Sequence, residues 1–168
     1  MRKYNDYENI VYGYLKHYNQ FKGQAANIGI EIQGIHEQIN SLCDARIAKY
    51  GDTPAGGFDE LSPAERIIVR KQKLEDELPI LTANRQRIEN IIMRVDNAMS
   101  TLPEVDREIV RMKFIDGYRW MRISEDMKYS ERNCQSKARR SVQELTKILF
   151  PKSMVAEQGT LDFVFVDN

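Results

Sequence analysis

Side chains that could contact nucleic acid are concentrated in one stretch of the second half of the chain. From Ser130 to Lys147 there are five basic and two acidic residues, a net charge of +3, although the whole chain is neutral. Arg and Lys donate hydrogen bonds to phosphates, and Arg and Gln can also form paired hydrogen bonds with base edges. The positive charge is therefore local, as expected for an element that enters a DNA groove.

The same stretch also has the pattern of an amphipathic helix. Ser130 is a favourable N-cap, because its hydroxyl can accept a hydrogen bond from the backbone N–H of Asn133. Apolar residues spaced by three and four would seat the helix on a scaffold, namely Cys134, Ala138, Val142 and Leu145. This division favours a DNA recognition helix. We expect its DNA-binding residues to be Ser130, Glu131, Arg132, Gln135, Ser136, Lys137, Arg139 and Arg140.

Two shorter helices are predicted before the recognition helix. Pro103 at a first helical position and acidic residues in the first turn predict a helix start, and Gly117 predicts its end. The next helix should span about residues 119–127, and a tight connection at Lys128 and Tyr129 should follow. The inward-facing residues are expected to be Val105, Ile109, Met112 and Phe114 in the first helix, and Trp120, Ile123 and Met127 in the second. The three helices together predict a helix-turn-helix unit.

The segment from Leu102 to Leu145, LPEVDREIVRMKFIDGYRWMRISEDMKYSERNCQSKARRSVQEL, resembles region 4 of sigma-70 factors, which binds the −35 promoter element through its last helix. It is also similar to phage late-gene regulators of the ArpU/RinA type, which pair such a unit with a helical N-terminal half. The resemblance implies base contacts and phosphate contacts at separate positions. The implied base contacts are Glu131, Arg132, Gln135 and Ser136, and the implied phosphate contacts are Lys137 and Arg140.

Two positions depart from the family pattern. Lys128 stands in the turn where the family usually has Gly, and Arg119 stands where it usually has a Ser or Thr cap. A residue other than Gly with positive φ is uncommon, so the turn is expected to be strained or differently shaped. The alternative interpretation of the segment is a three-helix packing module whose basic face is only solvated.

The first hundred residues are predicted to form a helical arm. Apolar residues spaced by three and four form one seam from Tyr4 to Leu42 and a second from Ile67 to Leu102. The Gly-rich stretch 51–62 between them predicts a linker. We expect an antiparallel hairpin or a pairing between two chains, with a break near Gly23 and a kink or break at Pro79. The predicted fold is all-α, with domains at 1–100 and 101–150 and a tail at 151–168.

The tail contains LDFVFV at 161–166, a pattern typical of a strand, which we expect to dock elsewhere on the protein. The composition is 42% hydrophobic and 30% charged, without an apolar run of about eighteen residues, so we expect a cytoplasmic protein with no membrane partner. Cys43 and Cys134 are expected to be reduced thiols. The chain lacks a metal-ligand cluster or a phosphate loop in its sequence pattern, and we expect neither a cofactor, a metal nor catalysis.

These observations predict a DNA-binding transcription regulator that binds double-stranded DNA and forms a homo-oligomer. The resemblance adds late-gene promoters of a phage or prophage, and RNA polymerase as a further partner. A small sigma factor-like protein is one alternative. The other is an interaction module that binds RNA polymerase without touching DNA.

Overall fold

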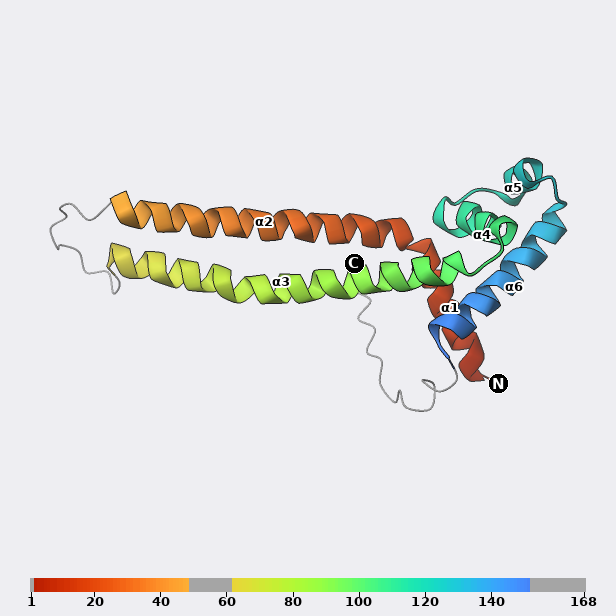
Figure 1. Cartoon of the computed structure of the whole chain (residues 1–168), viewed down its shortest axis with the longest axis horizontal. Helices are drawn as coiled ribbons and strands as arrows, with labels where there is room; N and C mark the ends of the chain where they lie inside the picture. Colours follow the sequence, from red (N-terminus) through yellow and green to blue (C-terminus); the bar gives the residue numbers. More distant parts are fainter. Residues whose placement is uncertain (1, 49–61, 152–168) are drawn as a thin grey trace. The chain divides into compact units, whose positions relative to one another are not determined.

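The computed structural model describes residues 2–48 and 62–151, and all regular secondary structure in these residues is helical (Figure 1). The predicted all-α fold is confirmed for this part of the chain. In order, the elements are α1 (Arg2–Lys16), α2 (Tyr18–Ala48), α3 (Pro63–Ser100), α4 (Glu104–Val110), the π-helical turn η1 (Arg111–Ile115), α5 (Trp120–Met127) and α6 (Glu131–Leu149). The predictions for residues 51–61 and for the tail from residue 152, including the strand at 161–166, lie outside the described residues.

The helices form two compact units whose boundaries differ from the expected one at residue 100. The first unit contains residues 2–19 and 91–151 of the described chain, and the second contains residues 20–90. Helix α1 therefore belongs to the same unit as the predicted helix-turn-helix. Aromatic contacts explain this, because the Tyr7 and Phe150 ring centroids lie 4.9 Å apart and those of Tyr12 and Phe114 lie 5.3 Å apart. Neither contact follows from local helix periodicity.

Within the second unit, α2 and α3 run antiparallel and form a hairpin (Figure 1). The predicted seam residues of this unit are buried or half-buried, with one exception. Arg85 is exposed, and its guanidinium extends towards Gly29 of α2, where a Cβ atom would lie 3.1 Å from Nη1 of Arg85. Glycine at this position therefore leaves room for a long basic side chain on the seam.

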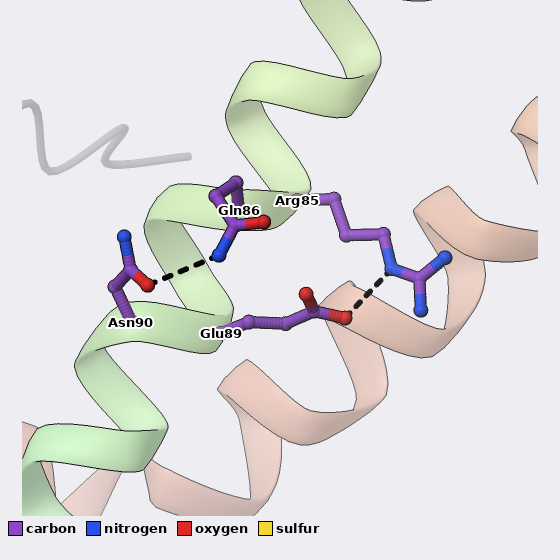
Figure 2. Close-up of polar contacts among 4 residues, drawn as sticks. All are labelled: Arg85, Gln86, Glu89 and Asn90. Atoms are coloured by element: carbon purple, nitrogen blue, oxygen red, sulfur yellow. Dashed lines mark hydrogen bonds and ion pairs between the residues drawn. The ribbon is translucent and has the colours of Figure 1, made fainter.

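Arg85 is held in this position by its own helix. Its Nε atom donates to Oε1 of Glu89 at 2.7 Å, one turn further along α3 (Figure 2). Gln86 makes the matching contact with Asn90 at 3.1 Å on the neighbouring side of α3. Each such pair on an exposed helix contributes only about 0.2–0.5 kcal/mol, so the apolar seam stabilises the hairpin far more than these pairs do.

The start of α3 has a capping box formed by Ser62 and Glu65. The backbone N–H of Ser62 donates to Glu65 at 2.7 Å, and the N–H of Glu65 donates to Oγ of Ser62 at 3.3 Å. These hydrogen bonds, first from the Ser62 backbone and then from its hydroxyl, lower the pKa of Glu65 below its ordinary value. Pro63 is the first residue of α3, a position where the missing N–H of proline has no helical partner to lose.

Neither helix is broken at the position where a break was predicted. Helix α3 continues through Pro79, which is exposed, so water can satisfy the Glu75 carbonyl that proline leaves without its helical partner. The N-terminal break lies at His17, between α1 and α2, instead of at Gly23. Tertiary contacts of Tyr18 and Asn19 fix this position, because Tyr18 donates to Asp96, and Asn19 donates to the carbonyl of Ile115 at 3.2 Å. These tertiary contacts decide where the helix is interrupted, and the low helix propensity of Gly23 does not.

None of the described helices is both long enough and apolar enough to cross a membrane.

Candidate nucleic-acid interface

The recognition helix is seated on a small apolar core formed by α4, η1, α5 and α6. The fully buried members of this core are Ile109, Met112, Ile123, Cys134 and Ala138. The partly buried residues packed around it are Val105, Phe114, Tyr118, Trp120 and Met127. Every inward-facing residue predicted for the first two helices is in this set, so those predictions are confirmed. Val142 and Leu145 extend the buried side of α6, as predicted from their spacing.

The first helix of the unit ends in a π-helical turn that the sequence did not indicate. The N–H of Asp116 donates to the carbonyl of Arg111 at 3.0 Å, and the N–H of Tyr118 donates to that of Met112 at 2.8 Å. These wide turns carry the chain into Gly117, whose φ of +74° is the left-handed conformation that glycine adopts without strain. Gly117 therefore ends the helix as predicted. Pro103 lies one residue earlier than expected, as the N-cap of α4.

The connection between α5 and α6 has the geometry of a tight helix-turn-helix turn. Lys128 adopts φ 59° and ψ 32°, the left-handed conformation that favours glycine. The turn strain expected from the departure at this position is thus localised in one backbone residue. Ser130 then caps α6, its hydroxyl accepting from the N–H of Asn133 at 3.3 Å. The predicted cap is confirmed.

Most of the expected DNA-binding residues lie on the solvent side of the first three turns of α6. Seven of the eight are exposed, namely Ser130, Glu131, Arg132, Gln135, Ser136, Arg139 and Arg140. In the part of the chain that the structure describes, the three arginines form no ion pair with a carboxylate. Among the described residues, therefore, no carboxylate has to be displaced before these donors reach phosphates or base edges.

Lys137 differs from the other seven residues. Its Nζ atom donates to Oδ1 of Asp106 on α4 at 2.8 Å, and lies 5.6 Å from the centre of the Tyr129 ring. The hydrogen bond to Asp106 raises the pKa of the Lys137 ammonium above its ordinary value. Its expected phosphate contact remains a prediction, and in this structure its charge is compensated from within the protein.

Helix α1 is an additional part of the unit that carries α6, and the sequence did not reveal it. It packs against α6 and η1, and burial raises the pKa of the Tyr12 hydroxyl, reinforced by Glu8 and opposed by Arg139. The effect of the Arg139 charge on the pKa of Tyr12 indicates that Arg139 lies near α1. On α3, Arg94 donates to the Leu149 carbonyl at 2.7 Å and so closes the end of α6. No local signal distinguishes these contacts, because the seam of α1 has the same spacing as that of α2.

Two buried hydroxyls on α6 were also not anticipated. Ser141 donates to the Lys137 carbonyl at 2.9 Å, and Thr146 donates to the Val142 carbonyl at 2.7 Å. Each bond stays within the helix, so both residues can be buried without an unsatisfied polar group. Cys134 is a free, fully buried thiol, and Cys43 is free and half-buried. Within the described ranges, no group of three or more His, Cys, Asp or Glu residues could hold a metal ion.

Comparison with known proteins gives one family match. Residues 92–145 match the family described as Sigma-70, region 4. No curated protein and no solved structure shows a significant similarity to the chain. The matched segment contains the end of α3 together with α4, η1, α5 and most of α6. The last four of these elements form the apolar core. This part of the chain is similar to sigma-70 region 4, and the similarity supports a DNA-binding role connected with transcription.

Proposed function

We propose that the protein is a sequence-specific DNA-binding transcription regulator whose α6 enters the major groove. The observation that carries the proposal is the exposed basic side of α6, opposite a fully buried apolar side, in a segment similar to sigma-70 region 4. A helix of this kind fits the major groove, where each base pair presents a distinct pattern of donors and acceptors.

Within this proposal, the side chains of α6 have two tasks. Arg132, Gln135 and Ser136 face base edges, with Ser130 and Glu131 at the helix start beside them. Arg139 and Arg140 contact phosphates. Arg offers a paired match to guanine and Gln to adenine, each worth about 1–3 kcal/mol of discrimination. Loss of one phosphate contact instead weakens all sites alike and lowers the salt slope by about 0.9.

Selection of bound duplexes from random DNA fragments tests the proposal. We expect enrichment of one sequence, relaxed preference at one or two positions in Arg132→Ala and Gln135→Ala, and uniformly weaker, less salt-dependent binding in Arg140→Ala. Arg87→Ala is the matched control, because Arg87 is an exposed arginine on α3 in the other unit. If correctly folded α6 variants bind as tightly and selectively as the parent, the helix does not read DNA.

The more specific part of the proposal is a phage or prophage origin and action at late-gene promoters, which rests on resemblance to ArpU/RinA-type regulators. RNA polymerase is the proposed second partner, as the similarity to sigma-70 region 4 suggests. Measurement of transcription from a promoter carrying the selected sequence, with and without the protein, tests this role. A selected sequence that leaves transcription unchanged would contradict it.

We also propose that the protein self-associates through its helical arm. Large apolar side chains remain exposed on the hairpin, with Ile30 70% and Ile80 63% accessible. Light scattering at high micromolar concentration should detect an oligomer, and a strictly monomeric species would refute this. A dimer should select two half-sites separated by one helical turn of DNA or a multiple of it.

One observation favours the second candidate, an interaction module that binds RNA polymerase without DNA contact. Met121 on α5 is 62% exposed, beside the half-buried Trp120, so the unit presents apolar surface as well as charge. Failure of the selection experiment together with retained binding to purified polymerase would favour this candidate. A Met121→Ala variant should then lose the interaction.

A further inference from the structure

The ion pair between Lys137 and Asp106 joins the recognition helix to the scaffold helix in front of it. The two residues are 31 positions apart in sequence, and their side chains are 29% and 22% accessible. Their charges are therefore more shielded from water than those of Lys71–Glu75 and Arg85–Glu89, whose side chains are 34–44% accessible, and less shielding by solvent favours a stronger ion pair. The ring of Tyr129, in the turn between α5 and α6, has its centre 5.6 Å from the same ammonium.

Lys137 also lies on a different side of α6 from most of the proposed DNA contacts. Because successive helical residues turn by about 100°, Lys137 points roughly 140–160° away from Arg132, Gln135 and Arg139. Arg140, one turn further along, is its basic neighbour, and its charge opposes protonation of Lys137. Asp106 and the Tyr129 hydroxyl favour protonation. The ammonium thus belongs to the junction of α4, the turn and α6, and not to the outer face.

We propose that Lys137 is a positioning residue, which with Asp106 sets the orientation of α6 on its scaffold and contributes no phosphate contact of its own. This inference rests on the proposed DNA-binding function and refines it. The net positive charge available to DNA then comes from Arg132, Arg139 and Arg140. Asp106, an acidic residue outside the recognition helix, becomes a determinant of sequence preference.

Two variants separate positioning from phosphate contact. Lys137→Met keeps the length of the aliphatic side chain and removes the charge, and the double variant Asp106→Arg, Lys137→Glu restores an ion pair with reversed signs. Binding is measured at several salt concentrations on the duplex enriched by selection and on a scrambled duplex of equal length. Arg140→Ala serves as the reference for loss of a true phosphate contact.

Positioning predicts that Lys137→Met loses about fivefold in affinity for the selected duplex and keeps its affinity for the scrambled one. Its salt slope should stay within about 0.3 of the parent, whereas that of Arg140→Ala falls by about 0.9. The charge-reversed double variant should recover most of the specific affinity, although it has no basic residue at position 137. If the ion pair only stabilised the fold, Lys137→Met would lower the free energy of unfolding. It would still prefer the selected duplex over the scrambled one as strongly as the parent does.

Two results would overturn the inference while leaving the proposed function intact. One is an equal loss on both duplexes with a slope decrease near 0.9 in Lys137→Met, which identifies a phosphate contact. The other is unchanged discrimination in Lys137→Met. If the parent itself selects no DNA sequence, the proposed function fails, and the inference fails with it.

Discussion

Relief of the backbone strain at Lys128 should stabilise the helix-turn-helix unit. At φ 59° and ψ 32°, a residue with a Cβ atom is disfavoured by roughly 1–2 kcal/mol relative to the right-handed region. Glycine avoids this penalty but loses more freedom on folding, which costs about 0.5–1 kcal/mol. The difference predicts that Lys128→Gly increases the free energy of unfolding by about 0.5–1 kcal/mol.

Lys128→Ala is the control, because alanine removes the charge and keeps the Cβ atom and its strain. Trp120 is the single tryptophan of the chain and packs against the apolar core, so its fluorescence reports unfolding of this unit. With a denaturant slope of about 1–3 kcal/mol per molar urea, the midpoint of Lys128→Gly should rise by about 0.2–1 M. The alanine variant should unfold close to the parent. A glycine variant that unfolds at or below the urea concentration of the alanine variant would refute the argument from strain.

Three further predictions concern helix ends and packing. Ser130→Ala should lower the free energy of unfolding by about 1 kcal/mol in the Trp120 assay, because the Asn133 N–H loses its acceptor; an unchanged midpoint would contradict the cap. Gly34→Ala should raise the free energy of unfolding of the hairpin by up to about 1 kcal/mol, since nothing lies within 4 Å of the new Cβ. Gly29→Ala should raise it less, because the Arg85 side chain must move. Circular dichroism during urea unfolding compares the two variants, and equal gains would argue against the Arg85 contact. Carboxyl NMR titration should place the pKa of Glu65 below its ordinary value, and Ser62→Ala should raise it part of the way back. Since the folded-state pKa is depressed, this cap stabilises α3 above the unfolded pKa and is lost as pH falls through the folded pKa; an unshifted titration would exclude the capping box.

Local chemistry made much of the helix-turn-helix predictable from sequence. The cap at Ser130 and the stop at Gly117 depend on residues within four positions of each other, so the sequence contains the whole interaction. The apolar side of α6 could be predicted equally well, because the buried positions follow the helical repeat. The exposed positions of its basic residues then followed from the same periodicity.

Long-range contacts explain what could not be predicted. The seam of α1 continues into that of α2 with the same spacing, so its pattern does not show that Tyr7 and Tyr12 pack against Phe150 and Phe114. Similarly, a lysine on a basic helix gives no sign of pairing with Asp106. The break at His17 also depends on distant partners, since the sequence alone favoured the glycine at 23.

The first unit is assembled from two segments that are separated by the whole hairpin, residues 20–90. During synthesis, α1 emerges first and its partners η1 and α6 emerge only after the hairpin, so the docking of α1 on α6 is a late, high-contact-order step. The entropy of closing such a loop depends only weakly on its length, by about 0.6 kcal/mol for each doubling. Removal of matched turns from α2 and α3 would therefore change the stability of the first unit very little. The length of the hairpin can vary in evolution or in design almost independently of the unit that it interrupts.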